Sequence, residues 1–248
     1  MTMRATIFSA ALISLAALLA VPAQVAADYR GEANVRIDDR SSLHRGARLF
    51  VNYCMGCHSA QYHRWMHVAN DLGIPDEVVQ ENFIWKTDEL GQKVQVGELM
   101  EIAMAEDYGN AVYGGMPPDL TLTARLRQED WIYNFLHSFY LDSNSPTGVN
   151  NAVMNATAMP HVLWDLQGLQ TAVRNDNGDI VDFELVQEGS MSPREFDRAV
   201  NDIVTFMSYL GEPAQLERRR IGVWVMLFLI VFTFMAWLLK REYWKDVH

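Results

Sequence analysis

The stretch that most constrains how this chain can fold runs from Ile221 to Leu239 and contains 19 residues without a charge (IGVWVMLFLIVFTFMAWLL). Inside a bilayer the backbone hydrogen bonds must be satisfied within the segment, so an uncharged stretch of this kind spans as an α-helix. At 1.5 Å per residue it is about 28 Å long, close to the roughly 30 Å of a hydrocarbon core. We therefore predict one transmembrane helix; a buried core helix is the alternative with the same composition.

The N-terminus carries a second apolar stretch, from Ile7 to Val21, which follows a short positive segment and precedes the small residues of PAQVAAD. This order is typical of a secretory signal peptide, and we predict cleavage after Ala27. A retained N-terminal anchor is the alternative, but the apolar stretch is short for a span. The prediction divides the chain into a signal peptide (1–27), an exported domain (28–217) and a transmembrane anchor with a short cytoplasmic tail (218–248).

The predicted exported domain is acidic. Residues 28–217 carry 29 acidic and 13 basic side chains, out of 31 and 20 in the whole chain. Nucleic-acid binding depends on basic residues that neutralise phosphates, so this balance argues against a nucleic-acid partner. It favours a cationic partner or plain solubility.

The only two cysteines, Cys54 and Cys57, are followed directly by His58 in the motif CMGCH. Cys-x-x-Cys-His is the signature of c-type haem attachment, in which two thiols add across the vinyl groups at one porphyrin edge and the imidazole takes the proximal position on the iron. The alternatives are a strained disulfide, a thioredoxin-like dithiol, and a zinc site completed by His63 and His67. In an exported domain, where free thiols oxidise, the motif favours one covalent haem c.

Two segments are predicted to form long helices that cross each other. The first opens at Ser42 as the N-cap and places Gly46 where a second helix can approach closely. The second runs from Ser192 to Leu210 and begins with a capping box whose acidic member is Glu195. Crossing N- and C-terminal helices around a haem are the arrangement of cytochrome c.

Shorter elements are predicted between these helices. Periodicity indicates helices from Glu98 to Ala105 and from Gln128 to Tyr140. The dipeptide Asn177-Gly178 between alternating apolar residues predicts a β-hairpin across residues 169–188. We therefore predict a mainly α fold that resembles a class I cytochrome c-like helical haem domain, with a small β-hairpin insertion, plus one C-terminal transmembrane helix.

Four segments, in chain order, resemble the cytochrome c1 family: CMGCH, GGMPPDLTLTARLRQEDW, NATAMPHVLWDLQG and DIVTFMSYLGEPAQLERRR. The last of them is followed by the single C-terminal span, as in that family. The resemblance covers essentially all of the chain after the predicted signal peptide. The haem motif is shared by c-type cytochromes in general, whereas the Pro-Pro-Asp-Leu segment, the anchor and their order narrow the resemblance to this family.

The resemblance implies further residues of the haem site. A ligating His58 has a second ring N–H that needs an acceptor, and the carbonyl of Pro117 or Pro118 would accept it, with Pro118 as the candidate. An ordinary turn is the alternative for this pair. A haem propionate needs a cationic, fork-shaped donor. The family places an arginine shortly after Pro-Pro-Asp-Leu, which aligns best with Arg127 and alternatively with Arg125; taken alone, both are equally consistent with solvated charges at a helix start.

The sixth ligand of the iron is predicted to be a methionine, because a thioether suits a high-potential electron carrier. Nine methionines fall within residues 28–217. Met154 and Met159 lie in a loop-like segment before the last helix of the domain, where cytochromes bring in their distal ligand. Met159, followed by Pro160, resembles the family's pattern and is the candidate; Met154 and His161 are the alternatives.

These features predict a single-pass, membrane-anchored monohaem cytochrome of the bacterial inner membrane, with its haem domain on the periplasmic side. The resemblance implies a subunit of the ubiquinol–cytochrome c oxidoreductase (cytochrome bc) complex, without a substrate site of its own. Electrons would arrive from a Rieske iron–sulfur protein and leave to a cytochrome c, beside a cytochrome b subunit in a dimeric complex. The alternatives are a haem c subunit of another respiratory membrane complex, and an independent peroxidase or thiol oxidoreductase.

Overall fold

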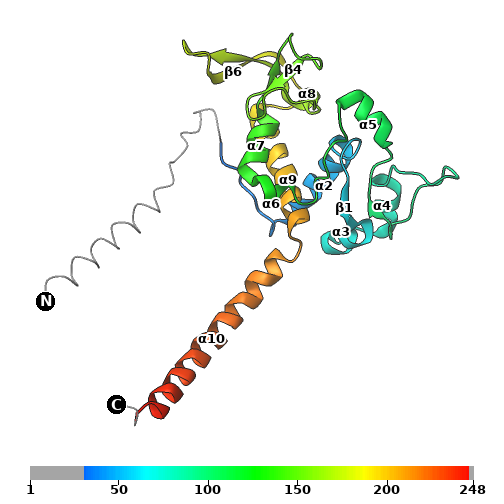
Figure 1. Cartoon of the computed structure of the whole chain (residues 1–248). Coiled ribbons are helices and arrows are strands. Elements are labelled where there is room, and N and C mark those ends of the chain that lie inside the picture. The colour runs from blue at the N-terminus through cyan, green and yellow to red at the C-terminus, as the bar shows by residue number, and fades with distance from the viewer. Residues whose placement is uncertain (1–30, 246–248) are drawn as a thin grey trace. The chain divides into compact units, whose positions relative to one another are not determined.

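A computed structural model describes residues 31–245, and the predicted signal peptide lies outside this range. Most of the elements are helices, and the strands within this range pair into three two-stranded antiparallel sheets (Figure 1). In chain order the elements are α2 (Arg40–Tyr53), β1 (Ala60–Arg64), α3 (Trp65–Leu72), α4 (Asp76–Asn82), β2 (Leu99–Met100), α5 (Glu106–Tyr113), α6 (Thr123–Arg127), α7 (Glu129–His137), β3 (Phe139–Leu141), β4 (Val149–Asn151), α8 (Trp164–Gln167), β5 (Gly168–Arg174), β6 (Ile180–Glu188), α9 (Pro193–Gly211) and α10 (Gln215–Tyr243).

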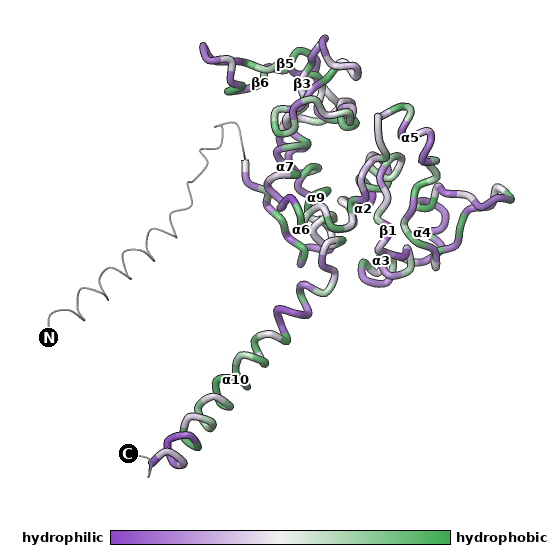
Figure 2. The backbone as a smooth tube through the Cα atoms, viewed as in Figure 1, coloured by the Kyte–Doolittle hydropathy of each residue, from purple (hydrophilic) through white to green (hydrophobic). Residues whose placement is uncertain are grey.

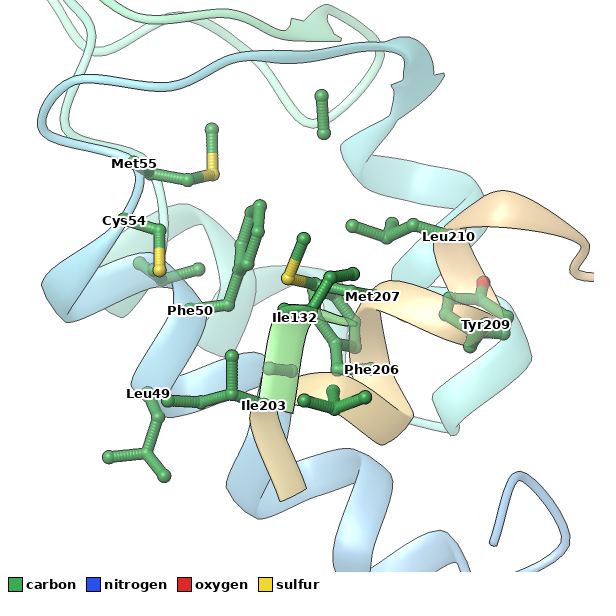
Figure 3. Close-up of a cluster of buried hydrophobic side chains, with 14 of the residues drawn as sticks. Leu49, Phe50, Cys54, Met55, Ile132, Ile203, Phe206, Met207, Tyr209 and Leu210 are labelled. Carbon is green, nitrogen blue, oxygen red and sulfur yellow. The ribbon is translucent and has the colours of Figure 1, made fainter. Parts of the chain in front are cut away.

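The core is centred on the contact between α2 and α9. A Cβ added to Gly46 of α2 would lie 2.0 Å from the carbonyl oxygen of Asp202 on α9, so only glycine permits this approach. The rings of Phe50 and Phe206 meet beside it with their centroids 5.3 Å apart. Figure 3 shows how this interior continues to Cys54 at the end of α2. The predicted crossing of the two helices is confirmed.

The predicted N-terminal cap is confirmed for α9 but not for α2. Helix α9 begins with the predicted capping box, in which the Ser192 N–H donates to the Glu195 carboxylate at 2.9 Å. The prediction that Ser42 caps α2 is wrong. Asp39 is the N-cap, because its carboxylate accepts the N–H groups of the first turn, and the Ser42 hydroxyl instead donates to Asp202 Oδ1 at 2.6 Å.

Two other predicted helices need correction. The helix from Glu98 to Ala105 is wrong: Leu99–Met100 forms strand β2, which pairs with β1, and α5 begins only at Glu106. The helix from Gln128 to Tyr140 is shorter than predicted, since α7 ends at His137 and β3 follows. Strand β2 pairs with β1, which is remote in the sequence, whereas β3 pairs with β4, the next strand along the chain. In both places the strand pairing decides the conformation, and helical periodicity does not report it.

The β-hairpin and the long C-terminal helix are present where the sequence predicts them. Strands β5 and β6 pair antiparallel, and Gly178 in their connection has φ 88°, a left-handed conformation that suits glycine. Helix α10 has 29 residues, none of them buried, and is long and apolar enough to cross a membrane. Its middle is hydrophobic and its two ends are hydrophilic (Figure 2).

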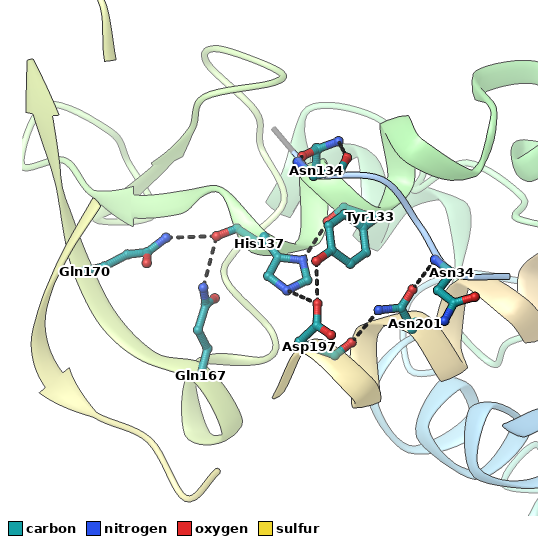
Figure 4. Close-up of polar contacts among 9 residues, drawn as sticks. Asn34, Tyr133, Asn134, His137, Gln167, Gln170, Asp197 and Asn201 are labelled. Carbon is teal, nitrogen blue, oxygen red and sulfur yellow. Dashed lines mark hydrogen bonds and ion pairs between the residues drawn. The ribbon is translucent and has the colours of Figure 1, made fainter. Parts of the chain in front are cut away.

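Polar side chains fasten α7 to α9 and to the segment that precedes α2 (Figure 4). The Tyr133 hydroxyl donates to Asp197 of α9, and His137 Nδ1 donates to the Tyr133 carbonyl at 2.9 Å. The Asn134 side chain pairs with the backbone of Gly31, accepting at 2.9 Å and donating at 2.8 Å. These bonds hold the start of the described chain against the helical core.

Candidate functional site

The cysteine motif lies in the turns that follow α2. The N–H groups of Cys57 and His58 both donate to the carbonyl oxygen of Cys54, at 3.0 and 2.9 Å. This tight turn brings the two cysteines and the histidine to one end of the helix. Both thiols are free, with Cys54 buried and Cys57 partly exposed. Burial, and secondarily the neighbouring Cys57, raises the pKa of Cys54 to about 12.

The histidines proposed for a zinc alternative do not join the cysteines. His63 is buried on β1, and its Nε2 lies 2.8 Å from the carbonyl oxygen of Leu210. Its ring stacks on Tyr209 of α9. His67 is exposed on α3. The motif is therefore left with the single adjacent histidine, His58.

The geometry of His58 suits a metal ligand. Its ring is buried, and Nδ1 donates to the carbonyl oxygen of Pro118 at 2.8 Å. Because a carbonyl only accepts, this bond places the proton on Nδ1 and leaves Nε2 unprotonated and able to coordinate a metal. Burial lowers the pKa of His58, outweighing the opposing effects of Pro118 and Asp119. The imidazole is therefore neutral, as a metal ligand must be.

The segment around Pro118 is tied back to the residues that follow the motif. Asp119 accepts the Gln61 N–H at 2.8 Å through one carboxylate oxygen and the Thr121 N–H at 2.9 Å through the other. The Leu120 N–H donates to the Ser59 carbonyl at 2.8 Å. Of the two prolines left open by the sequence, Pro118 is thus the one whose carbonyl is held against the histidine.

The two candidate arginines have different partners. Arg125 pairs with Glu212 at 3.1 Å, where the C-terminal end of α9 leads into α10. The guanidinium of Arg127 lies over the Trp131 ring, 5.1 Å from its centroid. The structure thus commits Arg125 to an ion pair beyond α9, whereas Arg127 has an aromatic neighbour and no ion pair among the described residues.

The three candidate distal ligands occupy the connection between β4 and α8. Met154 is exposed, whereas Met159 is partly buried and packs against the hydrophobic core. His161 is buried, and its ring stacks on Phe139 with an interplanar angle of 5°. Burial lowers the pKa of His161 to about 4. Burial and core contact distinguish Met159 from the exposed Met154.

Comparison with known proteins identifies the family. The model of the Cytochrome C1 family matches residues 32–247, nearly the whole described chain. The chain belongs to the cytochrome c1 family. The predicted resemblance is confirmed.

Individual relatives agree with this assignment. Cytochrome c1 of Allochromatium vinosum is 46% identical over 241 residues, which cover 93% of this chain and 96% of the relative. A protein of Nitrosomonas europaea named ammonia monooxygenase gamma subunit is 40% identical over 210 residues, or 85% of each chain. The mitochondrial cytochrome c1 haem protein of Schizosaccharomyces pombe is 27% identical over 228 residues, with 84% and 68% covered.

Members of the cytochrome c1 family carry a covalently bound haem c and take part in respiratory electron transport. The donor groups of this chain fit that cofactor. Two free thiols three residues apart can attach a porphyrin edge, and the buried neutral imidazole of His58 has its Nε2 available for a metal. Tyr113 is a neighbour that the motif did not predict, with its hydroxyl 4.0 Å from Cys57 Sγ. The sequence carries no local signal for this contact.

Proposed function

We propose that this chain carries electrons from a Rieske iron–sulfur protein to a soluble or membrane cytochrome c, as a subunit of ubiquinol–cytochrome c oxidoreductase. The observation that carries the proposal is the fixed His58–Pro118 pair beside two free cysteines, in a chain of the cytochrome c1 family. A cytochrome b subunit is the proposed neighbour, and the complex is proposed to be dimeric. In this role the chain accepts and releases an electron, and it needs no substrate site of its own.

The residues of the site have separate tasks. The thiols of Cys54 and Cys57 would each add S–H across one vinyl group, which would fix the cofactor without releasing an atom. The Pro118 carbonyl holds the His58 ring in orientation and makes Nε2 more basic. Met159 is proposed to hold the iron through a soft, neutral sulfur, which would favour the ferrous state. The bound haem supplies the one-electron chemistry.

Arg127 is proposed to bind a haem propionate. A guanidinium offers several N–H donors in a planar fork that matches a carboxylate. Arg125 is the weaker candidate, because its guanidinium already pairs with Glu212 at 3.1 Å. Such a contact compensates propionate charge inside the protein.

The arrangement in the membrane belongs to the same proposal. Residues 1–27 are proposed to be a cleaved signal peptide, residues 28–217 a periplasmic haem domain, and residues 218–248 the anchor and tail. The candidate span in α10 supports a single-pass anchor. The signal peptide would direct residues 28–217 across the bacterial inner membrane, and the C-terminal tail would stay inside.

A second candidate function has support from one comparison. The relative from Nitrosomonas europaea that is 40% identical to this chain bears the name of an ammonia monooxygenase subunit. This observation favours, as the alternative, a haem c subunit of another respiratory membrane complex. Such a subunit would keep the haem and the anchor and would have different neighbours.

Purification of the intact complex separates the two candidates. The chain is tagged at its C-terminus, extracted from membranes with a mild detergent and captured. The proposal predicts that a cytochrome b and a Rieske protein are recovered with it, and that the sample reduces cytochrome c with ubiquinol. Recovery with a different set of membrane subunits, and without a Rieske protein, would support the alternative and overturn the proposal.

A further inference from the structure

Residues 152–163, here called the Met159 loop, connect β4 to α8 and contain no helix or strand. Its backbone N–H groups are therefore not paired within a helix or a sheet. Because backbone groups near a protein interior need partners, side chains must supply many of them. Two buried asparagines at the end of β4, Asn150 and Asn151, provide many of them. Neither residue was singled out by the sequence.

Asn151 is fully buried, and both ends of its amide are used. Its Oδ1 accepts the N–H groups of Val153 at 2.9 Å and Met154 at 3.0 Å. Its Nδ2 donates to the carbonyl oxygen of Phe135 on α7 at 2.8 Å. One side chain thus ties the beginning of the Met159 loop to a core helix.

Asn150 holds the middle of the loop in the same way. Its Oδ1 accepts the Ala156 N–H at 2.9 Å, and its Nδ2 donates to the Asn155 side chain at 2.9 Å and to Asp142 at 3.0 Å. Ala156 has φ 58°, a left-handed conformation that is unfavourable for alanine. The bond to Asn150 holds this conformation in place, three residues before Met159.

We propose that Asn150 and Asn151 are positioning residues, which hold the Met159 loop so that the thioether of Met159 stays on the iron. This inference rests on the proposed ligation by Met159. Asparagine is suited to the task because its amide accepts from the loop and donates to the scaffold at once. Alanine would leave several N–H groups of the loop without partners, and aspartate would bury a charge and lose the donor.

The experiment uses the full-length protein carrying its haem, with the variants N150A and N151A. Methionine ligation is read from the weak sulfur-to-iron absorption band of the ferric protein, from carbon monoxide binding to the ferrous protein, and from the reduction potential. We expect each variant to raise the sulfur-off population about tenfold, because the loop loses hydrogen-bond partners near the protein interior; this fold-change corresponds to about 1.4 kcal/mol, within the range for an unsatisfied buried group. Carbon monoxide binding should rise and the band should weaken accordingly.

Asn134 offers a matched control, because it is also buried and uses both ends of its amide, but it binds Gly31 instead of the Met159 loop. N134A should lower stability without changing the band or carbon monoxide binding. The proposal fails if N150A and N151A keep wild-type ligation below their unfolding transitions. It also fails if N134A changes ligation to the same degree, because the effect would then be general destabilisation.

A fourth variant, M159L, keeps this inference apart from the ligand assignment. If M159L retains the band and still excludes carbon monoxide, Met159 is not the ligand and the assignment itself is overturned. If M159L loses the band while both asparagine variants keep it, only the positioning role is overturned. Should an alanine variant fail to accumulate with haem, the serine variant at that position, which keeps an oxygen acceptor but loses the amide donor, is read in its place.

Discussion

At the scale of single residues, burial fixes the chemical state of the groups at the site. It keeps the His58 imidazole neutral, and the Pro118 carbonyl decides which ring nitrogen carries the proton. It also raises the pKa of the Cys54 thiol to about 12, so this cysteine is not a reactive thiolate in the folded protein before attachment. For Cys54, a raised pKa suits a thiol that forms a permanent bond rather than a redox or nucleophilic group.

The roles of the two cysteines can be tested separately with Cys57→Ala. Cys54 should still hold the haem, because one thioether bond is enough to resist denaturation. The denatured variant should therefore retain haem on a gel, with the spectrum of one remaining vinyl group, whereas the wild type shows none. Haem that is fully extracted from the wild type by acidified organic solvent would contradict covalent attachment.

The partly buried His137 should make the folded state sensitive to acid. Burial lowers its pKa and outweighs the Tyr133 carbonyl and Asp197, both of which favour the charged form. In the unfolded chain, histidine has a pKa of about 6.5, above the lowered pKa of His137 in the folded protein. At pH values between these two, the unfolded chain therefore binds more protons than the folded protein. The free energy of unfolding should therefore fall as pH falls through this window, by at most about 1.4 kcal/mol per pH unit from this group.

The variant His137→Gln should flatten that dependence. Chemical denaturation from about pH 8 to about pH 5 measures the slope across the range in which histidine changes charge. His67→Gln, on an exposed histidine, controls for the loss of an imidazole at the surface. An unchanged slope in the His137 variant would show that burial of this ring does not contribute.

At the scale of elements, the domain depends on the close crossing of α2 and α9. Arg45 and Ser42 on α2 both bind the buried Asp202 carboxylate, with the Arg45 Nε at 2.6 Å. Gly46, beside them on α2, lets the backbones of α2 and α9 approach closely. Because α2 leads directly into the cysteine turn, this crossing also fixes where the haem motif begins.

Gly46→Ala should disrupt this crossing. Its new Cβ would lie 2.0 Å from the Asp202 carbonyl oxygen, so the helices must move apart. We expect a loss of about 1–3 kcal/mol or more in the free energy of unfolding, measured by denaturant titration. Gly97→Ala is the matched control, because a Cβ there meets no atom within 4 Å. Equal stability of the two variants would contradict the close packing.

The elements that the sequence predicted well are those with local signals. The capping box at Ser192, the hairpin turn at Gly178 and the uncharged stretch in α10 all lie within a few residues of the structure they cause. The haem motif is local in the same sense. By contrast, strand β2 forms because it pairs with β1, and it lies where the sequence predicted a helix.

The parts of the site that the sequence left open share this long-range origin. The choice between Pro117 and Pro118 depends on how the segment is tied to the residues after the motif. The bracing of the Met159 loop depends on the bond from Asn151 to Phe135 of α7, which joins the local asparagine contacts within the loop to the helical core. Nothing in the local pattern of Asn150 and Asn151 distinguishes them from surface residues of a turn.

At the scale of the whole molecule, the haem domain and the membrane helix are consecutive and chemically distinct. The domain buries its apolar side chains, whereas α10 exposes them along its length. Between them, Glu212 accepts hydrogen bonds from Arg218 and pairs with Arg125 of α6. The helix therefore begins within the polar surface of the domain.

Truncation after Arg220 should separate the two parts. The cut keeps the Glu212–Arg218 pair at the end of the domain and removes the apolar stretch. We expect a soluble, red protein with an unchanged visible spectrum, because no candidate ligand lies in α10. Loss of the low-spin haem spectrum in the truncated protein would show that the span supports the haem site.

The most direct test of the proposed function follows this chain's haem within the purified complex during a single turnover. Ubiquinol is added in a rapid-mixing instrument, and the haem absorbance is recorded together with the state of the Rieske cluster and of added cytochrome c. The account predicts that the haem is reduced after the Rieske cluster and is reoxidised as cytochrome c becomes reduced. Reduction of cytochrome c at the wild-type rate by a complex whose chain carries Cys54→Ala and Cys57→Ala, and therefore no attached haem, would contradict it.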